Sequence, residues 1–308
     1  AIERVIADAS NLVGTFDKPR FIRFEESLCA HSRSNITGCT RCLDLCPTGA
    51  ITPNGNAVSV DPYVCAGCGS CASACPTGAA SYALPDSDAL MRRLRTLLQT
   101  YRTTGGEHAT VLFHDGDHGE PLIDALARFG EGLPANVLPV RVNEITQLGP
   151  ETLTAVFAYG GTGVALLMRA QPRHETAGLR RAADMSNIIV AALGFGSEII
   201  RILETDDPDQ LRLMLDAMPA GVISPNPANF IPRGAKRGVL ETTLRELHLA
   251  APSPVDVVSL ASGAPFGSVE LNVESCTLCH ACVTACPTHA LSDNPDRAML
   301  RFTESLCV

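Results

Sequence analysis

Four of the thirteen cysteines in this 308-residue chain lie in one short stretch, Cys65-Ala-Gly-Cys68-Gly-Ser-Cys71-Ala-Ser-Ala-Cys75-Pro76. Two residues separate each of the first three cysteines, and the fourth follows three residues later, directly before a proline. This spacing is typical of the ligands of [4Fe–4S] clusters. The alternatives are a zinc site or a set of disulfides, but zinc ligands usually come as Cys-x-x-Cys pairs separated by a dozen or more residues. The small residues between the cysteines predict a tight loop whose backbone amides face the sulfurs.

A second cysteine run precedes this stretch and repeats its pattern. Its members are Cys29, Cys39, Cys42 and Cys46, and Pro47 follows the last of them. Nine residues separate the first two cysteines, and this insert, which starts with Ala30-His31-Ser32, predicts a polar surface loop. The segment Cys46-Pro-Thr-Gly-Ala50 returns as Cys75-Pro-Thr-Gly-Ala79, and a short strand is expected after each copy. The two runs therefore form an internal repeat that predicts one small module.

A third run lies near the C-terminus, at Cys276-Thr-Leu-Cys279-His-Ala-Cys282-Val-Thr-Ala-Cys286-Pro287. It has the spacing of the first stretch. The final segment Arg301-Phe-Thr-Glu-Ser-Leu-Cys307 closely matches Arg23-Phe-Glu-Glu-Ser-Leu-Cys29. Cys307 is therefore predicted to be the first cysteine of a fourth run, and the chain is expected to be a fragment of a longer protein with a truncated last module.

Composition and charge restrict the class of protein. Twelve of the thirteen cysteines fall in these three ligand runs, which favours cofactors in a reducing, cytoplasmic compartment over disulfides. The formal net charge of −9 argues against a nucleic-acid partner and is compatible with a basic redox partner. No apolar stretch of about eighteen residues occurs, so no membrane span is expected.

Between Pro85 and Pro252 there is no cysteine, and apolar runs alternate with helical patterns. Strands are predicted at 109–113, 137–142, 164–168 and 199–203, and helices at 86–101, 120–129, 150–159, 175–193, 208–218 and 234–249. This alternation predicts a parallel sheet covered by helices. The expected domains are a two-cluster module at 1–84, an α/β domain at 85–252 and a second iron–sulfur module at 253–308.

Two other features of the central region have alternative interpretations. The glycines of 160–163 and 194–196 follow helices and precede strands, so they are predicted to be turns and not phosphate-binding loops. Polar residues gather after the predicted strands: His114-Asp-Gly-Asp-His118, Arg141, Glu144, Arg169, Arg173, His174 and Asp206-Asp207. The segment 114–118 favours a polar turn in which Asp115 or Asp117 caps the next helix, with a metal site as the alternative. A docking rim for a partner is the third interpretation.

The cysteine runs at both ends resemble bacterial-type ferredoxin domains that carry two [4Fe–4S] clusters. In that family the fourth cysteine of each run serves the other cluster. The resemblance therefore implies one cluster on Cys46, Cys65, Cys68 and Cys71, and a second on Cys29, Cys39, Cys42 and Cys75. A third would use Cys276, Cys279 and Cys282 without a regular fourth ligand. A fourth, involving Cys286 and Cys307, would be completed in the full-length protein.

The central region resembles the delta-subunit domain of methyl-viologen-reducing hydrogenase, which implies a flavodoxin-like α/β fold. The resemblance lies in 133–137 with 140–142, in 153–159 with 163–167, and in Ile200-Arg-Ile202. The hydrogenase domain carries cysteines for a further iron–sulfur centre, whereas the corresponding loop here, 114–118, has none. The whole arrangement is similar to multi-cluster ferredoxin-like proteins found alongside formate dehydrogenases in proteobacteria.

These observations predict an iron–sulfur protein that relays electrons to or from a partner oxidoreductase, with formate dehydrogenase as one possible partner. Full thiolate ligation leaves no open iron position for a substrate, so no catalytic residue is expected. Two alternatives stay open: an assembly, maturation or sensing factor for a metalloenzyme, and a flavin-binding subunit of a redox complex.

Overall fold

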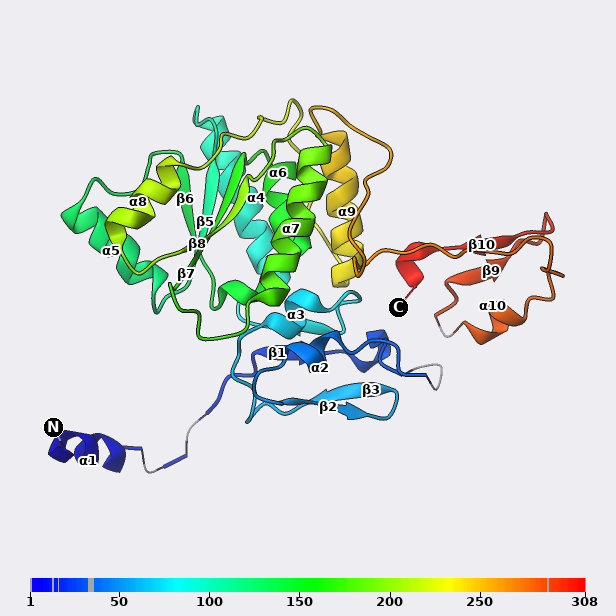
Figure 1. Cartoon of the computed structure of the whole chain (residues 1–308), viewed down its shortest axis with the longest axis horizontal. Coiled ribbons are helices and arrows are strands. Elements are labelled where there is room, and N and C mark those ends of the chain that lie inside the picture. The colour runs from blue at the N-terminus through cyan, green and yellow to red at the C-terminus, as the bar shows by residue number, and fades with distance from the viewer. Residues whose placement is uncertain (1, 13, 16, 33–35, 287, 308) are drawn as a thin grey trace.

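The computed structural model describes residues 2–12, 14–15, 17–32, 36–286 and 288–307. Figure 1 shows a small module near the N-terminus, an α/β domain above it, and a short C-terminal segment beside them. Helix α1 (Ile2–Ser10) lies away from these parts. Among the described residues, none of the helices combines the length and apolar character needed to cross a membrane.

The N-terminal module consists of short elements that pair across its length. Their bounds are β1 (Ile22–Phe24), η1 (Glu26–Leu28), α2 (Arg41–Leu45), β2 (Ile51–Asn54), β3 (Ala57–Val60), α3 (Ser70–Ala74) and β4 (Ala80–Tyr82). The first strand pairs antiparallel with the last, so that Ile22 lies opposite Tyr82, and β2 pairs antiparallel with β3. Because β1 and β4 come from opposite ends of the module, this pairing joins the two halves of the repeat.

The α/β domain begins with α4 (Ser87–Thr103) and contains the four strands that the apolar runs predicted. Its further elements are β5 (Thr110–His114), α5 (Gly119–Phe129), β6 (Val137–Arg141), η2 (Ile145–Gln147), α6 (Pro150–Ala158), β7 (Gly163–Met168), α7 (Ala177–Ala192), β8 (Ile200–Glu204), α8 (Pro208–Asp216) and α9 (Lys236–Leu249). In the described part of the chain the sheet order is β6-β5-β7-β8, and all the pairs are parallel. The prediction of a parallel sheet with alternating helices is confirmed.

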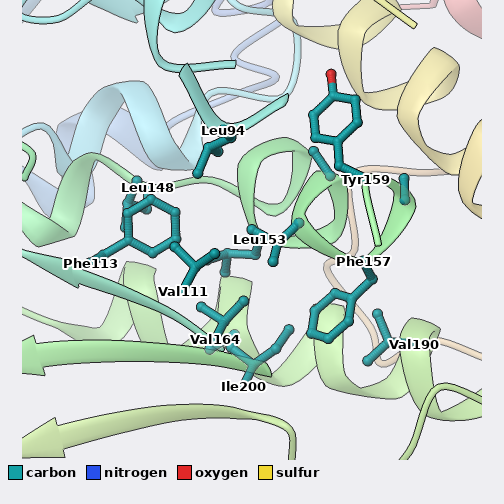
Figure 2. Packing of buried hydrophobic residues seen from close by; sticks show 14 of the residues in the cluster. Leu94, Val111, Phe113, Leu148, Leu153, Phe157, Tyr159, Val164, Val190 and Ile200 are labelled. Carbon is teal, nitrogen blue, oxygen red and sulfur yellow. The ribbon is translucent and has the colours of Figure 1, made fainter. Parts of the chain in front are cut away.

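Helices cover both faces of this sheet (Figure 1). On one face α5 and α8 enclose a small core around Leu112, Leu126 and Leu211. On the other face α4, α6, α7 and α9 enclose the larger core, in which Phe113, Phe157 and other apolar side chains interdigitate (Figure 2). All nine residues of α6 are buried, because this helix lies between the sheet and the outer helices. The N-terminal module contacts this side of the domain through α3, which packs on α7 and η2.

The two glycine segments of the domain form turns, as predicted. Gly160 follows α6 with a φ of +94°, and Gly194 follows α7 with a φ of +84°. The amide of Gly161 donates to the carbonyl of Val156, which satisfies an acceptor at the end of the helix.

The C-terminal segment contains α10 (Ala281–Ala285), β9 (Leu291–Asp293), β10 (Leu300–Phe302) and η3 (Glu304–Leu306). The two strands pair antiparallel. Arg237 of α9 connects the segment to the α/β domain: its guanidinium donates to the carbonyl of Pro265 at 2.8 Å and contacts the carboxylate of Glu304.

Candidate iron–sulfur sites

The eight N-terminal cysteines fall into two groups, each lining its own cavity. Cys29, Cys39, Cys42 and Cys75 line one cavity together with Phe24 and Val58. Cys46, Cys65, Cys68 and Cys71 line the other together with Ile22, Leu45 and Val60. These are the two sets that the ferredoxin resemblance implies, so each set takes three cysteines from one run and one from the other. That each set holds a cluster stays a prediction.

The two groups are close neighbours inside one small core. Cys29 and Cys71 are buried in a hydrophobic cluster with Ile51, Ala57 and Val58, and Cys42, Cys46 and Cys75 pack against it. Burial, followed by the neighbouring thiols of Cys75, Cys39 and Cys29, raises the pKa of Cys42 to about 12. Burial also raises the pKa of Cys71, with a further contribution from the thiols of its own group and from Cys42. Sulfurs held this close and this dry are unfavourable as thiolates unless cations such as cluster irons compensate their charge.

The donor set therefore fits [4Fe–4S] clusters. Four thiols surround each cavity, and a cubane is held through four separate irons. Within the described ranges, no group of three or more His, Cys, Asp or Glu side chains lies close enough to hold a single metal ion.

Threonines hydrogen-bond to the last cysteine of each run, a feature that the sequence analysis did not identify. The hydroxyl of Thr48 lies 3.8 Å from the sulfur of Cys46, and that of Thr77 lies 3.6 Å from the sulfur of Cys75. Burial acts to raise the pKa of Cys46, but hydrogen bonds from Thr48 and from nearby backbone amides outweigh it and lower the pKa. The threefold occurrence of Cys-Pro-Thr in the sequence is the signal that could have revealed these threonines.

The insert between Cys29 and Cys39 is only partly the surface loop that was predicted. Residues 33–35 lie outside the described residues, and Ile36 is exposed. His31 is buried, contrary to the prediction, and its Nδ1 lies 2.9 Å from the carbonyl oxygen of Cys39, which compensates the burial of this polar ring. This contact ties the start of the insert to its end.

The loop and helix that carry Cys68 and Cys71 are docked on the α/β domain. The hydroxyl of Thr146, in η2, donates to the carbonyl of Cys68 at 2.5 Å, and Ser73 donates to the carbonyl of Leu148 at 3.0 Å. Tyr82 donates to the carbonyl of Gly67 at 2.6 Å. The domain that carries no cysteines therefore helps to fix the geometry of the cysteine loop.

The C-terminal cysteines have much less protein around them. Cys279, Cys282 and Cys307 are exposed, and Cys276 and Cys286 are partly buried. Pro287 of this run lies outside the described residues. The hydroxyl of Thr288 lies 3.9 Å from the sulfur of Cys286, as in the other two runs.

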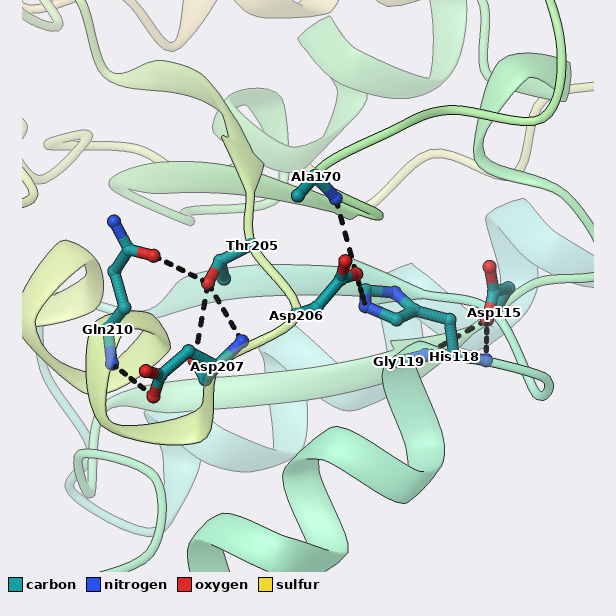
Figure 3. A network of polar contacts seen from close by, with 8 residues as sticks. All are labelled: Asp115, His118, Gly119, Ala170, Thr205, Asp206, Asp207 and Gln210. Atoms are coloured by element: carbon teal, nitrogen blue, oxygen red, sulfur yellow. Dashed lines mark hydrogen bonds and ion pairs between the residues drawn. The ribbon is translucent and has the colours of Figure 1, made fainter.

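Turns and helix caps account for Asp115 and Asp207 of the polar cluster at the carboxyl ends of the strands (Figure 3). A carboxylate oxygen of Asp115 accepts from the amides of His118 and Gly119, at 2.6 and 2.9 Å, and so holds the start of α5. The Nε2 atom of His118 lies 3.0 Å from the carboxylate of Asp206, which joins the loops after β5 and β8. Asp207 caps α8 through the amides of Asp209 and Gln210. The prediction of a polar turn at 114–118 is confirmed, and of the two expected capping residues it is Asp115 that contacts the start of α5.

Comparison with known families gives two matches. A 4Fe-4S dicluster domain matches residues 37–79, and a 4Fe-4S binding domain matches residues 269–292. Comparison with curated proteins and with solved structures gives no match. The resemblance of the central domain to the hydrogenase subunit, and the link to formate dehydrogenase, therefore stay predictions. The chain contains two 4Fe-4S ferredoxin-type domains, separated by a domain with a four-stranded parallel sheet.

Proposed function

We propose that the chain is an electron-transfer protein that relays electrons through [4Fe–4S] clusters to or from a partner oxidoreductase. One observation supports this most directly: the two N-terminal runs interleave, so that two sets of four thiols line neighbouring cavities in one core. The bound clusters would supply one-electron chemistry at low potential. Cys276, Cys279 and Cys282 of the third run would hold a further cluster in the C-terminal module.

The residues around the thiols have three roles in this proposal. The apolar side chains of the core exclude water from the sulfurs. The hydroxyls of Thr48 and Thr77 and the amide of Ala80, which donates to the sulfur of Cys75 at 3.5 Å, adjust the charge on the ligands. Such hydrogen bonds and burial set the potential of a cluster. The close approach of the two sets keeps the path for an electron short.

The α/β domain would position the clusters and contribute to partner docking. Its strand order β6-β5-β7-β8 supports the flavodoxin-like interpretation, because it matches the first four strands of that order. The proposal that the partner is an enzyme of the formate dehydrogenase or hydrogenase type rests only on the resemblance described in the sequence analysis.

The test is the measurement of iron and acid-labile sulfide, together with low-temperature EPR, on protein prepared without oxygen. We expect at least about eight irons per chain, from two [4Fe–4S] clusters, and reduced-state signals that depend on Cys65. Zinc in place of iron, or a folded metal-free protein with disulfides, would contradict the proposal.

A second candidate function, a flavin-binding redox subunit, is favoured by one cavity. A volume of about 500 Å³ lies between the N-terminal module, α7, α9 and the segment 261–265. Its lining is mainly apolar and includes Cys75 and the basic side chains of Arg41 and Arg181. This volume is in the usual range of small-molecule sites, which often lie between domains. A flavin absorption spectrum in the purified protein would support this function, and its absence after incubation with flavin mononucleotide would remove it.

A further inference from the structure

The chain has only two lysines, and both donate to backbone carbonyls of the N-terminal module. The Nζ atom of Lys18 donates to the carbonyl of Tyr63 at 2.7 Å in an exposed position. Lys236, the first residue of α9, donates to the carbonyl of Ala72 at 2.6 Å and to that of Ser73. Its side chain is only 11% exposed. The two lysines thus make the same kind of contact in different dielectric surroundings.

The position of Lys236 relates it directly to the predicted clusters. Ala72 and Ser73 lie between Cys71 and Cys75, which belong to the two different ligand sets. Lys236 and Cys75 also line the same cavity. Because it donates to the carbonyls of Ala72 and Ser73, the ammonium group of Lys236 lies at the C-terminal end of α3. The carbonyls of the last turn of a helix have no partner within the helix and attract a cation.

The backbone around Lys236 shows that this contact is built into the interface. Gly78 has a φ of +80°, and a Cβ atom there would lie 2.7 Å from the Cβ of Lys236 and 2.9 Å from its backbone nitrogen. The equivalent glycine of the first half of the repeat, Gly49, has nothing within 4 Å of such a Cβ. The second half of the repeat is thus fitted to the start of α9.

Among the described residues, one buried carboxyl group lies within ion-pair distance of Lys236. An oxygen of Glu151, whose side chain is 7% exposed, lies 3.7 Å from Nζ. Charges in such a dry place are screened weakly by salt and water. The next residue, Arg237, contacts the C-terminal module through Pro265 and Glu304. Two consecutive residues of α9 therefore contact both iron–sulfur modules.

We propose that Lys236 is a positioning residue through which the α/β domain raises the reduction potential of the cluster on Cys29, Cys39, Cys42 and Cys75. The inference rests on the proposed function, since it requires the clusters. Reduction adds one negative charge to a cluster, and a nearby buried cation stabilises the reduced form more than the oxidised form. Burial raises the pKa of the Glu151 carboxyl, while the charge of Lys236 acts to lower it. In its ionised form Glu151 has the opposite effect to Lys236 and limits the size of the shift.

The experiment is a redox titration followed by EPR on the full chain. Lys236→Met should make reduction of this cluster about tenfold less favourable, a shift of about 59 mV towards negative potential for a one-electron couple. Glu151→Gln, which removes the opposing charge and keeps the shape, should shift the potential in the positive direction. Lys236→Arg should keep most of the wild-type value. Lys18→Met is the matched control, and it should leave the potential unchanged.

The outcomes separate this inference from the proposed function. Wild-type protein without [4Fe–4S] clusters would refute the proposed function itself. Clusters present in all variants, with equal potentials in wild type and Lys236→Met, would overturn only the inference. If Lys236→Met does not fold, Lys236→Gln carries the test, and a zero or positive shift in that variant overturns the inference.

Discussion

The runs Cys65–Cys75 and Cys276–Cys286 have the same spacing and the same local backbone but very different surroundings. Gly67 and Gly69 have φ values of +77° and +80°, and the residues in the same places of the C-terminal run, Leu278 and His280, have +54° and +58°. A left-handed conformation is therefore required by the loop itself. Cys71 is 7% exposed, whereas its counterpart Cys282 is exposed.

The difference lies in what packs on the loop. A Cβ atom on Gly67 would lie 2.7 Å from the ring of Phe21, and one on Gly69 would lie 2.6 Å from the Cβ of Gln147. In the N-terminal run glycine is needed both for the left-handed backbone and for close packing. In the C-terminal run Leu278 and His280, both partly buried, occupy these places with positive φ, so the loop itself can accommodate side chains. Gly67 and Gly69 therefore distinguish the N-terminal loop, on which Phe21 and Gln147 pack closely, from the C-terminal loop.

The largest difference is expected when one ligand is replaced in each run. Cys71→Ser should remove a ligand from the buried core, and because each predicted cluster joins both halves of the repeat, the N-terminal module should lose about 4 kcal/mol or more of stability. Cys282→Ser should change the stability of this module little, since Cys282 lies in the other module. Thermal unfolding followed by cluster absorbance, with the iron content of each variant, measures both effects.

Equal losses of stability in these two variants would contradict the comparison. Loss of iron in Cys282→Ser together with unchanged melting of the N-terminal module would sharpen it, because the two modules would then bind their clusters independently.

The next effect concerns the left-handed position after the second cysteine. Gly69→Ala should destabilise the protein by about 2–5 kcal/mol, because it adds left-handed strain of about 1–2 kcal/mol and a clash with Gln147. His280→Gly should instead stabilise the C-terminal module, by about 1 kcal/mol or less, because it relieves the same strain. Urea unfolding of both variants distinguishes the signs, and a destabilised His280→Gly would show that the histidine has a packing role.

A smaller effect separates the two halves of the N-terminal repeat. Gly49→Ala should cost only the left-handed strain of about 1–2 kcal/mol, since nothing lies near the added methyl group. Gly78→Ala should cost about 1–3 kcal/mol more, because the methyl group would press on the backbone of Lys236. Limited proteolysis between the module and α9 should increase only in Gly78→Ala. Equal effects of the two substitutions would show that the interface adapts to the extra methyl group.

The parts of the fold that sequence could predict are those that depend on local patterns. The apolar runs predicted all four strands of the parallel sheet to within one residue at either end, because buried strands are continuous stretches of apolar residues. Strand β3 was missed, since Ala57–Val60 is short and follows its partner through a two-residue turn.

The grouping of the cysteines could be predicted only through the resemblance to ferredoxins. The docking of α3 on η2 and the contact with Lys236 join residues more than seventy positions apart. No local pattern records such contacts.

The smallest effect tests the edge of the α/β domain on which the N-terminal module docks. Burial, and after it the charges of Asp115 and Asp117, raises the pKa of Glu144 from 4.5 to about 7, while Arg173 and Arg169 oppose the shift. A raised carboxyl pKa means that the folded state binds more protons than the unfolded state between these two values, so stability is lost as the pH rises from about 4.5 to about 7.

Because a third of the Glu144 side chain is exposed, we expect this loss to be about 1 kcal/mol, well below the unscreened value. Glu144→Gln, which resembles the protonated form, should melt at the wild-type temperature at pH 5 and about 2–4 °C higher at pH 8. In the described part of the C-terminal module no carboxyl group has a raised pKa. The melting of that module should therefore not respond to Glu144→Gln at either pH. If Glu144→Gln is more stable than wild type at pH 5 as well, the effect comes from packing and not from the charge of Glu144.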